Sequence, residues 1–459
     1  MISPWDAALV GIFLAVTLAI GLRQKSRSSE SANYLLGGRA LTLPAFVATT
    51  VSTWYGGILG VGEYAWNYGI SNWLVFGVPY YVGALLFALL LSRRARSAES
   101  LTLPHRFERS YGPAAGKCAA VLIFLTTVPG AYMLIMGSLV SLSFGIPLAA
   151  GVLLTSVFVV IYLWRGGFGA VVRTDGIQIV LMFGGFMLLT ACLLIGTGTE
   201  ALSALPPGHL EPTGGQPLGS ILIWYVIALS TLAEPNFFQR AFAAKTPEIA
   251  RRGLLISIAF WIFFDMMTTL CGLYARALMP DLDVPLHAFP ALAAKVLPVG
   301  AVGIFFAGLF ATVLSTLDSN LFTTATTLGH DLWPQKTRLS DTLRTRIGLI
   351  VGALIAAGIA LASGSVVKIW KVFGSVSAAS LLIPILASYY PKYRMSSRGA
   401  VILMTASSLT TFVWFANAFF GDGAYWLNIE PLFAGGAVAI IIYFADRIAI
   451  RREAHESEQ

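Results

Sequence analysis

Stretches of about twenty mostly apolar residues recur along the whole chain and are separated by shorter polar segments. A helix needs about 20 apolar residues to cross the hydrocarbon core of a bilayer, so each stretch predicts one membrane span. The pattern therefore predicts an all-α polytopic membrane protein with 13 transmembrane helices. The stretches begin near residues 4, 42, 71, 114, 146, 172, 217, 250, 298, 343, 366, 399 and 428.

The composition agrees with a membrane protein. Of the 459 residues, 57% are hydrophobic and 11% are charged, whereas soluble domains have roughly 25% charged residues. No long polar linker or heptad run divides the chain, which predicts one polytopic domain over residues 1–459. The three cysteines are an odd number without metal-type spacing, so neither a disulfide nor a zinc site is expected.

The positions of the basic residues predict the orientation. No basic residue precedes the first apolar stretch, but Arg23, Lys25 and Arg27 follow it. The segment Arg93–Lys117 contains six basic residues, whereas Gly196–Gln216 contains none. Because cytoplasmic loops collect Lys and Arg, we expect a multi-pass protein of the cell membrane, the inner membrane of a bacterium, with its amino end outside and its carboxyl end in the cytoplasm. The net charge of +8 then has a topological cause, and no nucleic-acid partner is expected.

Two predicted spans contain residues that interrupt helices. The second span has four glycines within seven residues, and the seventh has Pro235 at its middle, which frees a backbone carbonyl. Irregular backbone at membrane depth is tolerated where it lines a cavity or is buried. Glycine and proline also occur in membrane helices for packing and kinks, so either break alone is ambiguous. The glycines are Gly56, Gly57, Gly60 and Gly62.

The two interrupted spans lie five spans apart. This spacing is typical of inverted-repeat transporters, which hold the solute and the ion at the breaks. We therefore predict a leading helix, two five-helix repeats, two trailing helices and a cytoplasmic tail. These segments cover residues 4–24, 42–196, 217–390, 399–447 and 448–459, respectively.

Four short motifs resemble those of the sodium:solute symporter family, in the same order and over nearly the whole chain. They are Leu36-Gly37-Gly38-Arg39-Ala40-Leu41, Thr174-Asp175-Gly176-Ile177-Gln178, Gln239-Arg240 and Ser315-Thr316. The resemblance implies the fold of the bacterial leucine transporter, with five plus five inverted core helices, one helix before them and two after. It also implies sodium-coupled symport of a small organic solute (an amino acid, a sugar or a carboxylate) by alternating access.

The same resemblance implies a sodium site between the second and ninth spans. Residues 312, 315, 316 and 319 share one helical face, and a hard monovalent cation takes about five oxygens, some from carbonyls freed by unwinding. Alternatively, these hydroxyls bond to carbonyls four residues earlier or hold helices together. The implied ligands are the carbonyls of Ser52, Tyr55 and Thr312 and the hydroxyls of Ser315 and Thr316.

Asp175, Asp318 and Ser319 form a candidate second site. In some relatives in the family, a second sodium lies between an acid matching Asp175 and hydroxyls matching Ser315, Asp318 and Ser319; this chain has an acid at 318. A carboxylate at membrane depth needs a partner or a wet cavity. The two acids could strengthen a cation site, one could hold a proton or pair with Arg173, or Asp175 could be a helix-start acid.

The resemblance places the solute beside the two breaks. Aromatic residues there would shape the walls of the site and polar groups would orient the solute, although each residue could instead serve packing. Asp265 in the eighth span is a further candidate. Where proline carriers in the family have an acid, this chain has Trp54, which argues against assuming proline. The candidates are Trp54, Tyr55, Glu63, Glu234, Asn236 and Phe237.

Other functional classes find less support in the sequence. The five histidines lie in loops, at helix ends or in the tail, and no hydrolase, zinc-protease or phosphate-loop motif occurs, so no enzyme activity is expected. A proton-coupled symporter on the same fold and a non-transporting membrane sensor remain alternatives. The expected partners are the solute, sodium and the lipid bilayer; neither a cofactor besides Na⁺ nor an obligate protein partner is implied.

Overall fold

The structure is a computed structural model that describes residues 2–23, 31–334, 338–363, 366–420 and 423–457. Over these ranges the chain forms helices and no strand, and its one β-bridge pairs Leu41 with Ala244. The predicted all-α class is therefore confirmed.

Twelve helical segments of the described ranges are long and apolar enough to cross a membrane. A helix with an apolar stretch of this length satisfies its own backbone groups in lipid, which explains why these sequences form helices. They comprise α1 (Pro4–Arg23), α5 (Val78–Leu90), α8 (Pro113–Thr127) with α9 (Gly130–Phe144), α10 (Leu148–Gly166), α11 (Phe168–Cys192), α12 (Leu218–Ile227) with α13 (Pro235–Ala243), α14 (Pro247–Leu278), α16 (Ala301–Thr326), α17 (Asp341–Ser363), α18 (Val366–Tyr389), α19 (Ser397–Phe420) and α20 (Pro431–Ser457). Shorter connecting helices are α2 (Ser31–Leu36), α6 (Ser92–Ser97), α7 (Leu103–Tyr111) and α15 (Ala288–Val296).

The segment expected to be the second span is divided. Helix α3 (Leu43–Ser52) ends where the glycine-rich stretch begins, and α4 (Ile58–Tyr68) starts after it. The five residues between them are not helical. Neither half alone is long enough to cross a bilayer, so this segment does not count among the twelve.

The seventh predicted span is also interrupted. After α12, a 3₁₀ turn covers Ala228–Ala233, and Glu234 has an extended backbone with φ −69° and ψ 112°. Pro235 then occupies the first turn of α13, where its missing N–H leaves no hydrogen bond unmade. The break therefore lies one residue before the proline.

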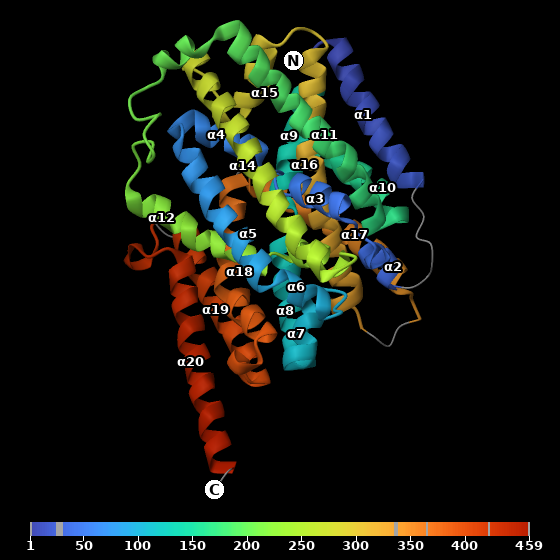
Figure 1. Cartoon of the computed structure of the whole chain (residues 1–459), viewed down its shortest axis with the longest axis vertical. Coiled ribbons are helices and arrows are strands. Elements are labelled where there is room, and N and C mark those ends of the chain that lie inside the picture. Colours follow the sequence, from blue (N-terminus) through green and yellow to red (C-terminus); the bar gives the residue numbers. More distant parts are fainter. Residues whose placement is uncertain (1, 24–30, 335–337, 364–365, 421–422, 458–459) are drawn as a thin grey trace.

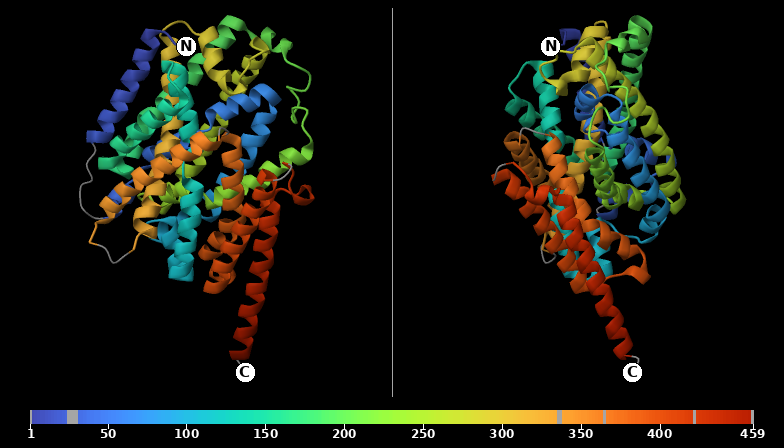
Figure 2. Two further views of the ribbon diagram at one scale, coloured as in Figure 1. Left: turned by 180° about the vertical axis from the view of Figure 1, so that it is seen from behind. Right: turned by 90° about the vertical axis from the view of Figure 1, so that its left-hand side faces the viewer.

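Helix α16 lies at the centre of the bundle and packs along α11 (Figures 1 and 2). In the most apolar stretch of the α16 span, 89% of the residues are buried, whereas the corresponding share for α20 at the periphery is 11%. Gly308 permits the close packing, since a Cβ there would lie 2.6 Å from the Leu181 carbonyl oxygen. The helix that carries Ser315, Thr316 and Asp318 is therefore enclosed by other helices.

The outer face of the bundle is apolar. Leu153, Leu154 and Val157 of α10 and Phe263 and Met266 of α14 are each 50–60% exposed. Large apolar side chains gathered on an exterior mark a surface that contacts lipid or another protein. Together with the apolar spans, these residues identify a multi-pass membrane protein.

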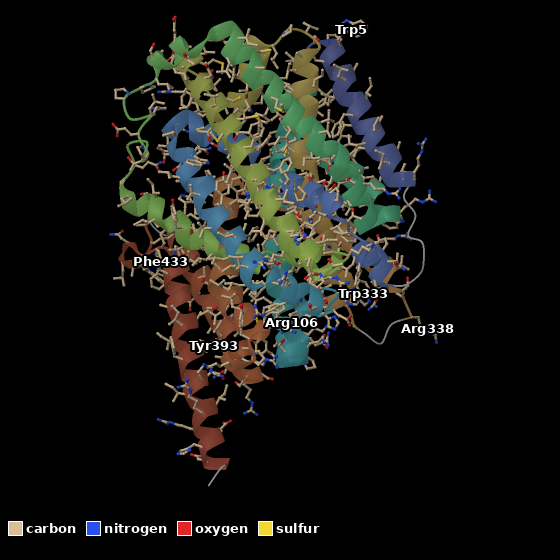
Figure 3. The ribbon with its side chains drawn as sticks, in the orientation of Figure 1. Trp5, Arg106, Trp333, Arg338, Tyr393 and Phe433 are labelled. Atoms are coloured by element: carbon tan, nitrogen blue, oxygen red, sulfur yellow. The ribbon has the colours of Figure 1, made fainter. Side chains whose placement is uncertain are left out.

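The two chain ends, marked N and C, lie at opposite ends of the molecule (Figure 1). Trp5 of α1 lies at the end marked N, and Arg106 of α7 lies toward the other end (Figure 3). Helix α20 extends to Ser457, so the segment expected as a cytoplasmic tail from residue 448 is helical up to that residue. Of the residues used to predict orientation and boundaries, Gln24, Lys25, Arg27, Glu458 and Gln459 lie outside the described ranges.

Candidate functional site

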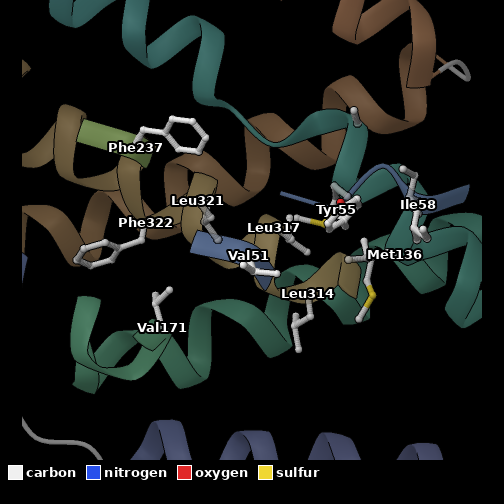
Figure 4. Packing of buried hydrophobic residues seen from close by; sticks show 14 of the residues in the cluster. Val51, Tyr55, Ile58, Met136, Val171, Phe237, Leu314, Leu317, Leu321 and Phe322 are labelled. Carbon is white, nitrogen blue, oxygen red and sulfur yellow. The ribbon is translucent and has the colours of Figure 1, made fainter. Parts of the chain in front are cut away.

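The break between α3 and α4 lies directly against α16. The Thr316 hydroxyl donates a hydrogen bond of 2.7 Å to the carbonyl of Thr53, just past the end of α3. Gly56 makes this approach possible, because a Cβ at this position would lie 2.4 Å from the Cβ of Thr316. Figure 4 shows Val51 and Tyr55 packed in one apolar cluster with Leu314 and Leu317 of α16.

The residues expected to bind sodium flank this contact. Among the described residues, no backbone amide donates to the Ser52 carbonyl, whereas the Tyr55 carbonyl accepts one at 3.0 Å. The Thr312 hydroxyl donates at 2.6 Å to the carbonyl four residues earlier, as the alternative interpretation expected for a helical threonine. Ser315 and Thr316 instead direct their hydroxyls to groups outside α16. Carbonyl and hydroxyl oxygens of this kind suit a hard monovalent cation.

Asp175 is fully buried and lies in contact with this region. It accepts a hydrogen bond of 2.5 Å from the Ser315 hydroxyl and another from the Thr49 hydroxyl of α3. It occupies the eighth position of α11, so the interpretation as an acid of the helix start is wrong. Its carboxylate therefore links α3, α11 and α16.

Asp318 and Ser319 continue the polar cluster along α16. The Tyr162 hydroxyl of α10 donates to Asp318 Oδ2 at 2.5 Å, and the Ser319 hydroxyl lies 3.3 Å from Asp318 Oδ1. Both residues are completely buried. The structure thus brings together the three residues predicted for a second cation or proton site.

The cationic partner of this cluster is Arg240 of α13, and the pairing of Asp175 with Arg173 is wrong. Arg173 is exposed. The Arg240 guanidinium is 1% exposed, and its Nη2 lies 3.8 Å from Asp175 Oδ2. The same nitrogen donates to Thr53 Oγ1 at 2.6 Å and to Ser319 Oγ at 2.7 Å. Sequence reasoning gave Arg240 no role, although an arginine in an apolar span was itself a signal of function.

The cluster has an excess of negative charge. Two carboxylates and one guanidinium sum to −1 when all three are ionised. A buried net charge is costly unless it is compensated. This arrangement can therefore take up one further monovalent cation or one proton.

A cavity of about 230 Å³ opens beside the two breaks. It is somewhat smaller than the roughly 300–1,000 Å³ of pockets for drug-sized ligands, so it fits a small solute. Of the predicted solute residues, Glu63 does not line it; it lies half-buried on α4. Those that do are Trp54, Tyr55, Glu234, Asn236 and Phe237, together with Asp265.

Asn236 is fixed by its neighbours on α16. Its amide nitrogen donates to Glu234 Oε1 at 2.9 Å and to Asn320 Oδ1 at 3.1 Å. Its amide oxygen accepts from the Thr323 hydroxyl at 3.0 Å. Asn320, which sequence reasoning missed, donates in turn to the Thr316 carbonyl at 2.9 Å. The second break is therefore connected to the same face of α16 as the first.

The model of the sodium:solute symporter family matches residues 34–406. The chain is 26% identical to the osmoregulated proline transporter OpuE of Bacillus subtilis over 94% of this chain and 93% of that protein. It is 28% identical to the sodium/pantothenate symporter of Haemophilus influenzae, over 85% and 86% of the two chains. These relatives are transporters and not enzymes, which confirms the expectation from the motifs.

Solved transporters share the fold. A Na⁺-coupled sialic acid symporter in a substrate-bound outward-open state superimposes with a TM-score of 0.76 at 16% identity, over 97% of each chain. A nucleobase-cation-symport-1 family transporter gives a TM-score of 0.53 at 13% identity, over 90% of this chain and 94% of that one. At these identities the likeness concerns the fold alone.

Proposed function

Because the chain belongs to the sodium:solute symporter family, we propose that it carries a small organic solute across the membrane together with sodium, by alternating access. The observation that carries the proposal is the bond between the Thr316 hydroxyl and the Thr53 carbonyl, which joins the broken helix to α16. Sodium would bind beside this contact, with Ser52, Tyr55, Thr312, Ser315 and Thr316 as its ligands.

The proposal includes a topology of 13 spans, with α3 and α4 together as the second. Residues 42–196 and 217–390 would form two inverted repeats, each beginning with a divided segment. This is the arrangement in which transporters hold their ligands at helix breaks. The chain ends lie at opposite ends of the molecule in Figure 1, as an odd number of spans requires. The basic residues that follow the first span would place the amino end outside and the carboxyl end in the cytoplasm of a bacterial inner membrane.

One sodium ion is sufficient for useful uptake. Moving one charge through 100 mV releases about 2.3 kcal/mol, and a tenfold gradient adds about 1.4 kcal/mol. The sum of about 3.7 kcal/mol concentrates a neutral solute several-hundred-fold. In the mechanism, sodium favours the outward-open state by holding the first break against α16, and inward opening separates the ligands and releases it.

Changing Ser315 and Thr316 together to Ala is expected to raise the half-saturating sodium concentration at least about 10-fold, or to abolish sodium stimulation, since two ligand oxygens are lost. Uptake by the reconstituted protein is measured against external sodium. Ser407→Ala is the matched control, because the Ser407 hydroxyl is also buried but bonds only within α19, at 2.6 Å. Unchanged sodium dependence of the double variant would refute the site.

A proton-coupled symporter is the second candidate, because the cluster of Asp175, Asp318 and Arg240 has an excess negative charge that a proton also neutralises. For sodium coupling, we expect uptake driven by a sodium gradient at equal pH on both sides and none driven by a pH gradient in potassium buffer.

Asp318→Asn, which removes the excess charge, should lower the number of charges moved per solute by one if the cluster takes up a cation in each cycle. The ratio of current to solute flux measures this number, and an unchanged ratio would limit coupling to the site at Ser315 and Thr316.

A further inference from the structure

The guanidinium at the cavity is engaged by several protein groups, whereas each of the two acids accepts hydrogen bonds on only one oxygen among the described residues. The three charged residues that line the cavity are Glu234, Arg240 and Asp265. The Arg240 guanidinium already interacts with protein groups, namely Thr53, Ser319 and Asp175. Asp265 accepts a hydrogen bond from the Tyr81 hydroxyl.

Glu234 has a free oxygen. Its Oε1 accepts from the backbone amide and the side-chain amide of Asn236, at 3.2 and 2.9 Å. Within the described part of the chain, its Oε2 has no hydrogen-bond donor, and Glu234 lines the cavity. The amides of Asn236 and Asn320 bond to each other and to α16. Among the described residues that line the cavity, a solute therefore meets a carboxylate that has a place for a cation, and no unengaged guanidinium or ammonium group.

Aromatic rings line the same cavity as this carboxylate. Trp54 stacks on Phe237 at 5.1 Å between ring centroids and meets Tyr80 edge-on at 5.6 Å. Tyr132 lies 6.2 Å from Trp370. All five rings line the cavity.

The two aromatic groups form one wall. Trp370 packs so closely on the first break that a Cβ at Gly57 would lie 2.0 Å from its ring. Tyr80, Tyr132 and Glu234 all line the same cavity. The rings thus come from four separate helical segments and the first break, and they line one cavity together with Glu234.

We propose that the solute is a small organic cation, whose ammonium group lies among the faces of Trp54, Tyr80, Tyr132 and Trp370 and pairs with Glu234. Ring faces attract an alkylammonium group through their quadrupole, and Trp is the strongest of them. The carboxylate adds the opposite charge, which a cation at this position would neutralise. The proposal rests on the proposed function, because it assigns the solute of the same transport site.

Binding to the purified full-length protein tests the solute class. The probes are choline, tetramethylammonium, the neutral choline isostere 3,3-dimethylbutan-1-ol, glucose and acetate, each in sodium and in potassium buffer. Choline is expected to bind at least about 10-fold more tightly than its isostere, because only the cation gains from the rings and the acid. Equal affinity for the isostere, tighter binding of glucose or acetate, or no organic cation that binds more tightly than about 10 mM would overturn the proposal.

Variants identify the acid. Glu234→Gln keeps an acceptor oxygen for the start of α13 and should lower choline affinity about 10-fold or more, while affinity for the isostere stays within about twofold. Glu63→Gln, the matched control, removes a half-buried acid away from the cavity and should change neither value. An equal loss for both probes would show a structural role only and would overturn the assignment of Glu234.

The buffers separate this inference from the function on which it rests. Cation binding that is equal in sodium and potassium would refute sodium coupling and retain the solute class. Sodium-dependent binding of glucose or acetate would retain the coupling and refute the class.

Discussion

Replacing Arg240 with methionine is expected to lower the free energy of unfolding by about 3–5 kcal/mol and to abolish uptake, because it leaves a buried carboxylate without its cation. The guanidinium is 1% exposed and lies 3.8 Å from Asp175. Its Nη2 also donates to Thr53 and Ser319, so the change removes hydrogen bonds that connect α13 to the first break and to α16. Unfolding in mixed detergent micelles measures the stability, and uptake into proteoliposomes measures the function.

A double-mutant cycle distinguishes the ion pair from general packing. Asp175→Asn combined with Arg240→Met removes both charges and should recover at least half of the lost stability, because residues in contact are not additive. Arg173→Met is the matched control, since Arg173 lies two residues from Asp175 but is exposed. A loss in this control as large as that for Arg240, or additivity of the two changes in the pair, would contradict the assignment.

The architecture was largely predictable from the sequence because its physical cause is local. Stretches of about 20 apolar residues, such as those of α10 and α17, form helices in lipid whatever their neighbours are. The two breaks were predictable for the same reason, since Gly56, Gly57 and Pro235 act on the backbone within a few residues. The end of α20 was not predicted, because a charged helix can continue past the membrane surface without any change in its hydrogen bonding.

The partners within the site were less predictable because they depend on contacts between distant segments. Asp175 and Arg240 are 65 positions apart, and the nearer Arg173 was the natural partner in the sequence. On α11, however, positions 173 and 175 point to different faces, and only the face with Asp175 turns toward α16. Likewise Glu63 and Glu234 both lie near a break, but only Glu234 lines the cavity. Helical facing and tertiary packing decide both cases.

Replacing Gly56 with alanine is expected to lower sodium-stimulated uptake at least about 100-fold while the protein stays folded. The added Cβ would lie 2.4 Å from the Cβ and 2.7 Å from the hydroxyl oxygen of Thr316. Thr316 belongs to a rigid, buried helix, so the first break must move away from it. That movement breaks the bond between the Thr316 hydroxyl and the Thr53 carbonyl and separates the ligands proposed for sodium.

A glycine-to-alanine change elsewhere in the bundle shows whether the loss of sodium-stimulated uptake depends on the contact between Gly56 and Thr316. Gly184→Ala is the matched control, because Gly184 lies within α11 and a Cβ there meets nothing within 4 Å; alanine at this helical position is expected to be neutral or slightly stabilising. Both variants are compared by thermal unfolding, by solute binding in potassium buffer and by sodium-stimulated uptake. Because the methyl group is small, Gly56→Ala should still fold, and the sodium response should fall far more than the unfolding temperature. Normal sodium stimulation in Gly56→Ala would mean that contact between the break and α16 is not required for coupling.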